Sequence, residues 1–100
     1  MITTVPSVLL DAHNEHEFVG YCVFDQVSGL YGLPTFYRHP VDAIRAFESA
    51  AIAQDVAGEG LLATHPQDFI YCAVCGYNTQ TSTVFPFDVP IRIQRADEVL

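Results

Sequence analysis

The feature that most constrains the fold is the apolar pattern of residues 40–52, which predicts a helix between two β-rich halves of the chain. Pro40 suits the first helical position, where its missing N–H leaves no bond unmade, and Asp42 faces the positive end of the helix dipole. Because a helix with one apolar face must bury it, the flanking β segments are its expected partners. The predicted apolar face is Ala43, Ile44, Phe47, Ala50 and Ala51, and the predicted polar face is Asp42, Arg45, Glu48 and Ser49.

Four apolar segments predict strands, two before the helix and two after it. They are residues 19–27, 31–38, 69–77 and 84–89. Both faces of the first segment are apolar, which indicates an interior or doubly covered strand. Pro34 places the second strand at a sheet edge or a bulge, because proline cannot donate to a ladder. Pro86 and Pro90 likewise predict that the fourth strand is an edge strand that ends early.

The resulting element order is β-β-α-β-β in one domain. Two hairpins joined by a helical crossover most simply give an α+β fold, a four-stranded antiparallel sheet with one main helix packed on one face. We expect an N-terminal arm over residues 1–18, the α+β domain over 19–90 and a charged C-terminal tail over 91–100. Residues 8–10 of the arm predict a short strand or a docking peptide, and residues 61–63 a helical turn. The second sheet face is either an exposed aromatic platform or covered by a partner chain, which favours a homodimer.

The charge of the chain limits the partners that it can bind. There are twelve acidic residues, four arginines and no lysine, for a formal net charge of −8. A protein that depends on phosphate neutralisation needs a basic patch, so protein partners, or base stacking with few phosphate contacts, fit this composition better. No apolar run approaches the length of a membrane span, and the N-terminus lacks the pattern of a signal peptide. We therefore expect a cytoplasmic protein without a membrane partner.

The cysteines and histidines predict no cofactor. Cys72 and Cys75 form a C-x-x-C, but positions 72 and 75 of an extended strand point to opposite faces unless a bulge intervenes. We expect core thiols, and the alternative is a metal or redox site that also uses Cys22. The spacing of His13 and His16 in a polar arm is interpreted as incidental. No nucleophile or acid–base partner is suitably spaced, so we predict that the protein is not an enzyme.

Aromatic residues interleaved with arginine are the remaining signal for a binding site. Single-stranded nucleic acids are commonly bound by bases that stack on such rings while arginine contacts the backbone. The alternative is that the rings are core, since strands alternate sides and about half must face the helix. Arginines grouped beside exposed rings would favour DNA, and arginines paired with nearby acids would not. The predicted nucleic-acid site is Tyr31, Phe36, Tyr37, Arg38, Arg45, Tyr71, Arg92 and Arg95.

A series of short motifs in a fixed order resembles a known family. It comprises Val23-Phe24-Asp25, Gly29 and Tyr31, Pro34 with Phe36 and Arg38, the helical segment Asp42-Ala43-Ile44-Arg45-Ala46-Phe47, then His65-Pro66-x-Asp68-Phe69, Gly76 and the loop at 78–82. Over residues 20 to 88 this pattern resembles the small nonstructural protein of microviruses (Microviridae), which are tailless bacteriophages with single-stranded DNA genomes. The similarity is closest to the gokushovirus branch.

This resemblance implies a nonstructural protein that acts in the host cytoplasm and is absent from the virion. The family is described as DNA-binding, with a proposed role in switching replication from duplex copies to single-stranded genomes. We therefore expect a non-catalytic accessory protein of viral DNA replication that binds single-stranded DNA and favours single-stranded genome production. The alternative is a protein-interaction module that redirects phage or host replication proteins without contacting DNA, which the net charge of −8 favours.

Overall fold

Helix α2 (Pro40–Ile52) occupies the position that the apolar pattern predicts. The computed structural model describes residues 4–52 and 64–99, so the turn expected at residues 61–63 lies outside the described residues. Two helical positions differ from the prediction: Ala50 is exposed, whereas Glu48 is buried with 9% of its surface exposed. Glu48 is accommodated there because its carboxylate accepts a hydrogen bond from Gln94 Nε2 at 3.2 Å. The buried apolar residues of the helix are Ala43, Ile44, Phe47 and Ala51.

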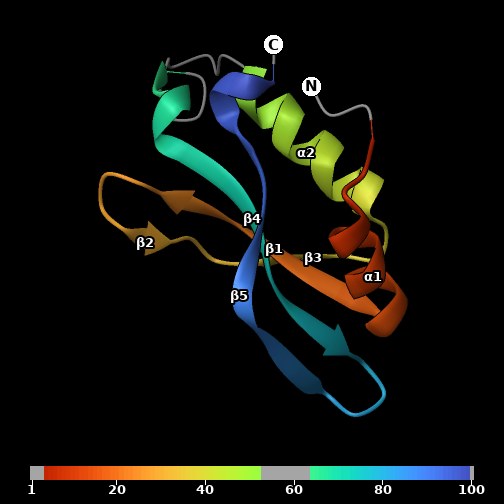
Figure 1. Cartoon of the computed structure of the whole chain (residues 1–100). Helices are drawn as coiled ribbons and strands as arrows, with labels where there is room; N and C mark the ends of the chain where they lie inside the picture. The colour runs from red at the N-terminus through yellow and green to blue at the C-terminus, as the bar shows by residue number, and fades with distance from the viewer. Residues whose placement is uncertain (1–3, 53–63, 100) are drawn as a thin grey trace.

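The strands form one antiparallel sheet, in the order β2–β1–β4–β5 with β3 also paired to β1 (Figure 1). The strands are β1 (Phe18–Asp25), β2 (Leu30–Tyr31), β3 (Thr35–Tyr37), β4 (Phe69–Asn78) and β5 (Thr83–Arg95). β2 and β3 occupy the same edge of the sheet, and the interruption between them contains Pro34, where the sequence predicts an edge or a bulge. The four sheet positions and α2 confirm the predicted α+β fold.

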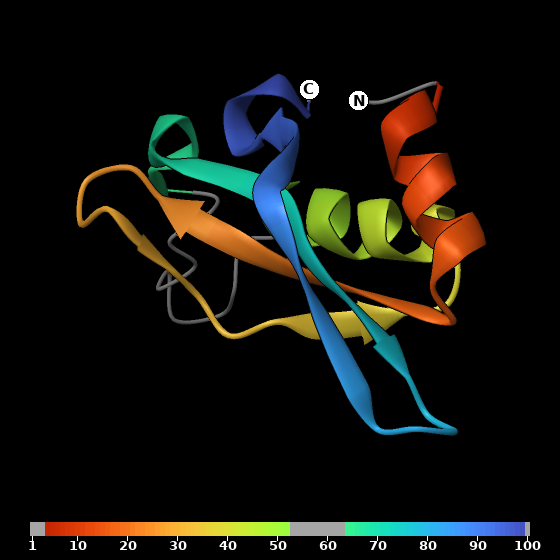
Figure 2. The same cartoon turned by 60° about the horizontal axis from the view of Figure 1, so that its bottom comes forward.

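The N-terminal segment differs from the predicted irregular arm, because Ser7–Glu15 forms helix α1. Leu9 is completely buried and Ala12 is 7% exposed, and both belong to the same core as α2. Figure 2 shows α1 and α2 on the same side of the sheet. The prediction was wrong because Leu9 and Ala12 are the only buried residues of the helix, and most of its other residues are polar.

The C-terminal tail also needs correction. β5 does not end near Val89 but continues to Arg95, and a short 3-10 helix, η2 (Ala96–Glu98), follows it. The pairing of β5 with β4 shifts register between Ala73, which pairs with Ile91, and Cys75, which pairs with Pro86. Residues 87–90 form the irregular part of β5, and regular pairing continues after Pro90. Val99 is only 1% exposed. Residues 91–99 are therefore part of the packed domain. Elsewhere in the chain, a second 3-10 helix, η1 (Pro66–Asp68), directly precedes β4.

Three stacked aromatic rings form the centre of the core between α2 and the sheet. Tyr71 on β4 stacks on Tyr21 of β1, with ring centroids 5.3 Å apart, and on Phe47 of α2 at 4.4 Å. Such offset stacking adds to the free energy gained by burying the rings. Burial also raises the pKa of both tyrosine hydroxyls, which therefore stay protonated.

His13 joins α1 to the sheet through two hydrogen bonds. Its Nδ1–H donates to the carbonyl oxygen of Arg38 at 3.0 Å, so Nε2 of the neutral ring accepts from the Tyr21 hydroxyl at 2.5 Å. Burial, as the largest cause, lowers the pKa of His13. An imidazolium has no acceptor, so after protonation of the ring the Tyr21 hydroxyl could no longer donate to Nε2.

Truncating Leu9 tests whether α1 is part of the core. Leu9→Ala should lower the free energy of unfolding by about 2–5 kcal/mol because it leaves a cavity in a completely buried position. Leu10→Ala, at a neighbouring residue that is 45% exposed, should change it by less than about 0.5 kcal/mol. Urea unfolding of both variants measures the difference. Equal, small effects would show that α1 is only loosely attached.

His13 should make stability depend on pH. Because the pKa of His13 is lower in the folded state, the unfolded state binds the proton more tightly. The contribution of His13 is therefore complete above the ordinary histidine pKa and is lost as the pH falls from about 7 to about 5. Thermal unfolding across this range should show a smaller decrease for His13→Gln than for the wild type. Parallel curves would contradict the assigned hydrogen bonds.

Candidate nucleic-acid interface

The face of the sheet that points away from α2 is defined by strand alternation. Val19 and Tyr21 of β1 are buried on the helix side, so Phe18, Gly20 and Cys22 lie on the other side. Neither α1 nor α2 packs on this second side, and we call it the open face. Its cross-strand rows are Phe18–Tyr77–Val84, Phe36–Gly20–Cys75–Pro86, Cys22–Cys72–Arg92 and Tyr31–Phe24–Ile70–Arg95.

One end of the open face holds an apolar hollow. Its volume is about 440 Å³, and we call it the aromatic hollow; it is lined by Phe18, Phe36, Tyr77, Thr79 and Val84. The ring centroids of Phe36 and Tyr77 lie 5.7 Å apart, and Phe36 is 39% exposed. The guanidinium carbon of Arg38 lies 4.7 Å from the centroid of the Phe18 ring, a cation–π contact. The hollow therefore combines one exposed ring, Phe36, and the partly buried rings of Phe18 and Tyr77 with a positive charge.

Gly20 allows Phe36 to lie close to the sheet beside this hollow. A Cβ atom at Gly20 would be 2.9 Å from Cε1 of Phe36 and 2.7 Å from Sγ of Cys75. Real Cβ contacts are essentially never so short, so a larger residue would push the Phe36 ring or the thiol away. The position of Phe36 thus depends on a glycine in the neighbouring strand.

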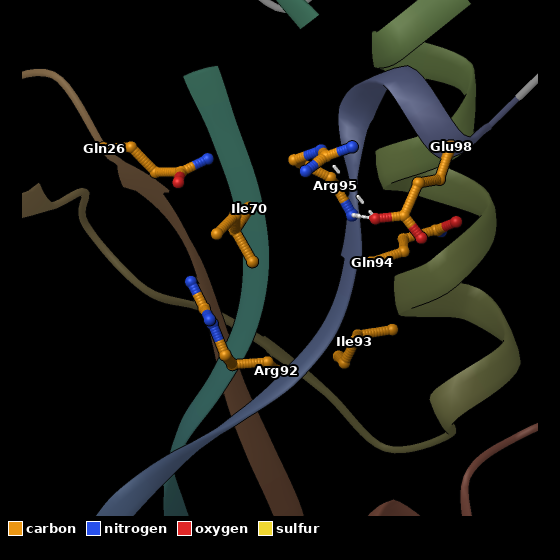
Figure 3. Close-up of a pocket in the computed structure, with 7 residues that line it drawn as sticks. All are labelled: Gln26, Ile70, Arg92, Ile93, Gln94, Arg95 and Glu98. Carbon is orange, nitrogen blue, oxygen red and sulfur yellow. Dashed lines mark hydrogen bonds and ion pairs between the residues drawn. The ribbon is translucent and has the colours of Figure 1, made fainter. Parts of the chain in front are cut away.

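The other end of the open face carries two arginines. Figure 3 shows Arg92 and Arg95 extending from β5 on the side that faces Ile70 of β4. They line a hollow of about 240 Å³ together with Gln26, Ile70, Ile93, Gln94 and Glu98. Arg95 is already partly neutralised, because its Nε–H donates to Asp97 Oδ1 at 2.6 Å and lies 3.9 Å from Glu98 Oε1. Arg92 is exposed and shows no ion pair among the described residues.

The structure brings five of the eight predicted site residues to the open face: Tyr31, Phe36, Arg38, Arg92 and Arg95. The other three lie elsewhere. Tyr71 is 6% exposed in the core stack and cannot offer its face to a base. Tyr37 pairs with Val19 on the helix side and contacts Tyr21 edge-on, with centroids 5.8 Å apart. Arg45 lies on the exposed side of α2, away from the aromatic hollow.

Three aromatic residues of the open face, Phe18, Phe24 and Tyr77, were absent from the predicted site. Phe24 packs on Tyr31, with ring centroids 4.5 Å apart. Phe18 was placed in the arm because the first strand was predicted to begin at residue 19, whereas β1 begins at Phe18. The alternation of β1 alone would have assigned Phe18 and Phe24 to one face. Tyr77 required the register of β4, which contains a bulge.

The cysteines lie on one face, contrary to the prediction for a regular strand. The register shift between Gly20 and Tyr21 inserts Val74 as an extra residue, so Cys72 faces Cys22 and Cys75 faces Gly20. All three thiols are free and buried. Burial raises the pKa of each, that of Cys72 to about 11, which keeps the thiols protonated and weakly reactive. No cluster of three or more metal-ligating side chains occurs within residues 4–52 and 64–99.

These features define a small α+β domain with two helices on one face of an antiparallel sheet and an aromatic, arginine-flanked open face. Residues 18–99 match the model of the family described as Phage ORF5 protein, and the chain belongs to this family. The match starts with β1 and ends after η2, so it contains the whole sheet and α2, whereas α1 lies before the matched residues. No curated protein and no solved structure matches the chain. In the described part of the chain, no helix has the length and apolar character needed to cross a membrane.

Gly20→Ala tests how tightly the open face is packed. The clash with Phe36 and Cys75 should lower the free energy of unfolding by about 1–3 kcal/mol and alter the environment of the Phe36 ring. Gly32→Ala is the matched control, since its nearest contact would be 3.4 Å, to the Val23 carbonyl oxygen. Denaturant unfolding and aromatic proton NMR measure the two effects. A neutral Gly20→Ala substitution would contradict this packing.

Proposed function

We propose that this bacteriophage protein is a non-catalytic accessory factor of viral genome replication that binds single-stranded DNA on the open face. The observation that carries the proposal is the aromatic hollow with Arg38 at its border. Exposed rings offer stacking surfaces to unpaired bases, and each stacked base contributes about 1–3 kcal/mol. A duplex keeps its bases stacked on one another, so this surface favours single strands.

The charge distribution supports a binding mode with few phosphate contacts. Three of the four arginines, Arg38, Arg92 and Arg95, border the open face, although the chain has a net charge of −8. Arg95 is paired with Asp97, so Arg38 and Arg92 are the better placed phosphate contacts. The affinity should then fall with salt on a shallow slope, because that slope scales with the number of phosphates neutralised.

The biological role follows from the resemblance to the microvirus nonstructural protein, and membership of a phage family is consistent with it. In this proposal the protein acts in the host cytoplasm, is absent from the virion, and favours production of single-stranded genomes by holding displaced single strands. A homodimer is part of the proposal. Strongly exposed apolar residues near the β1–β2 turn support a second copy there: Val27, Leu30 and Leu33, at 77%, 68% and 92% exposure.

A second candidate function is a protein-interaction module that redirects phage or host replication proteins without contacting DNA. The ion pair between Arg95 and Asp97 favours this candidate, because it withdraws one of the four arginines from phosphate binding. The net charge of −8 acts in the same direction by repelling a polyanion.

Two arginine substitutions with the same change in charge separate these candidates. Arg38→Ala should weaken binding to a single-stranded oligonucleotide about three- to tenfold, because it removes a cation beside the aromatic hollow. Arg45→Ala, on the exposed side of α2, should change the affinity by less than about twofold. Fluorescence anisotropy across a salt series, with a duplex for comparison, measures both effects.

The outcome at low salt decides between the two functions. Absence of binding to any single strand would contradict direct DNA recognition and leave the protein-interaction module. Equal losses in Arg38→Ala and Arg45→Ala would show general electrostatic attraction rather than a site on the open face.

A further inference from the structure

The aromatic hollow has a carboxylate at its border as well as a guanidinium. Thr79, which lines the hollow, binds Glu17 through both its backbone N–H and its hydroxyl. The hydroxyl lies 3.0 Å from Glu17 Oε2, and it also donates to Oε1. Because Thr79 lines the hollow, these hydrogen bonds place the Glu17 carboxylate at the border of the hollow.

The two charges approach the hollow from different sides. Arg38 follows β3 and Thr79 follows β4, and β1 lies between these strands in the sheet. Phe18 on β1 is therefore flanked by the guanidinium on its β3 side and by the Glu17–Thr79 pair on its β4 side. The hairpin that carries Thr79 projects away from both helices in Figures 1 and 2, so solvent reaches this side.

A nucleotide matches this arrangement. Its ring is apolar on both faces, its phosphate is anionic, and adenine, cytosine and guanine carry an exocyclic amino group that donates to a carboxylate. An apolar side chain from a protein would use the rings but would make no polar contact with Arg38 or Glu17. The volume of about 440 Å³ is within the range of roughly 300–1,000 Å³ that is usual for small-molecule sites.

We propose that the aromatic hollow is a base-selective subsite that takes one amino-bearing nucleobase of a single strand, with its phosphate at Arg38 and its amino group at Glu17. A carboxylate has about four acceptor positions, so Glu17 keeps acceptor capacity beyond its bonds to Thr79. Thymine has no amino group, and its one ring donor, N3–H, lies between two carbonyl oxygens that face the carboxylate unfavourably. This inference rests on the proposed DNA binding and adds a preference among bases.

Competition between oligodeoxycytidine and oligothymidine of equal length tests the subsite, since both are unstructured pyrimidine strands. Fluorescence anisotropy with the full chain should show about three- to tenfold tighter binding of oligodeoxycytidine. Glu17→Ala should abolish this ratio. Glu15→Ala removes the same charge from an exposed position of α1, and this variant should retain the preference for oligodeoxycytidine.

A further variant distinguishes the effect of the Glu17 carboxylate on binding from its effect on the structure of the β4–β5 hairpin. Thr79→Val breaks the hydroxyl contact to Glu17 but keeps the carboxylate, so the preference for oligodeoxycytidine should persist. If Thr79→Val lost this preference, the preference would depend on the hairpin structure, and the proposal would be overturned. Equal binding of both oligonucleotides by the wild type would overturn the subsite while DNA binding stands. Binding of neither would overturn the proposed function itself.

Discussion

The stacking of Tyr71 with Tyr21 and Phe47 determines which face of the sheet is core and which is open. This stack joins β4, β1 and α2 in one apolar contact, and it fixes the side of the sheet on which α2 packs. Strand alternation then places Phe18, Gly20 and Cys22 on the opposite side. The site that we propose is therefore a consequence of how the core is packed.

The open face is shaped by small residues in its middle and large ones at its ends. Gly20 and the three cysteines occupy the two central rows, which end in Phe36 on one side and Arg92 on the other. The rings of Phe18 and Tyr77 lie in the row at one end of the face, and Arg95 lies with Phe24 and Tyr31 in the row at the other end. Raised pKa values keep the buried thiols neutral, so they act as small apolar side chains. A surface of this kind suits a flexible chain that alternates apolar bases with charged phosphates.

The sequence predicted the fold well, but it could not show which aromatic residues share the open face. Helix α2 was predictable because its apolar spacing is regular, and Pro34 correctly indicated an edge. Helix α1 was missed because it buries only two residues, Leu9 and Ala12, while the apolar Val8 and Leu10 beside them are exposed. Tyr71 and Tyr37 lie on the helix side of the sheet, which their sequence could not show because a ring in a strand belongs to core or surface according to register. In β4 the bulge around Val74 shifts that register, and no local pattern reveals it.

The central claim is that the open face, rather than the helical side, binds single-stranded DNA. Backbone amide NMR of the labelled protein, titrated with a short single-stranded oligonucleotide, tests it most directly because every described element reports separately. We predict that the largest shifts occur at Phe18, Gly20, Phe36 and Tyr77, with little change at exposed positions of α2 such as Arg45. Shifts concentrated on α1 and α2, or no shifts at low salt, would contradict it.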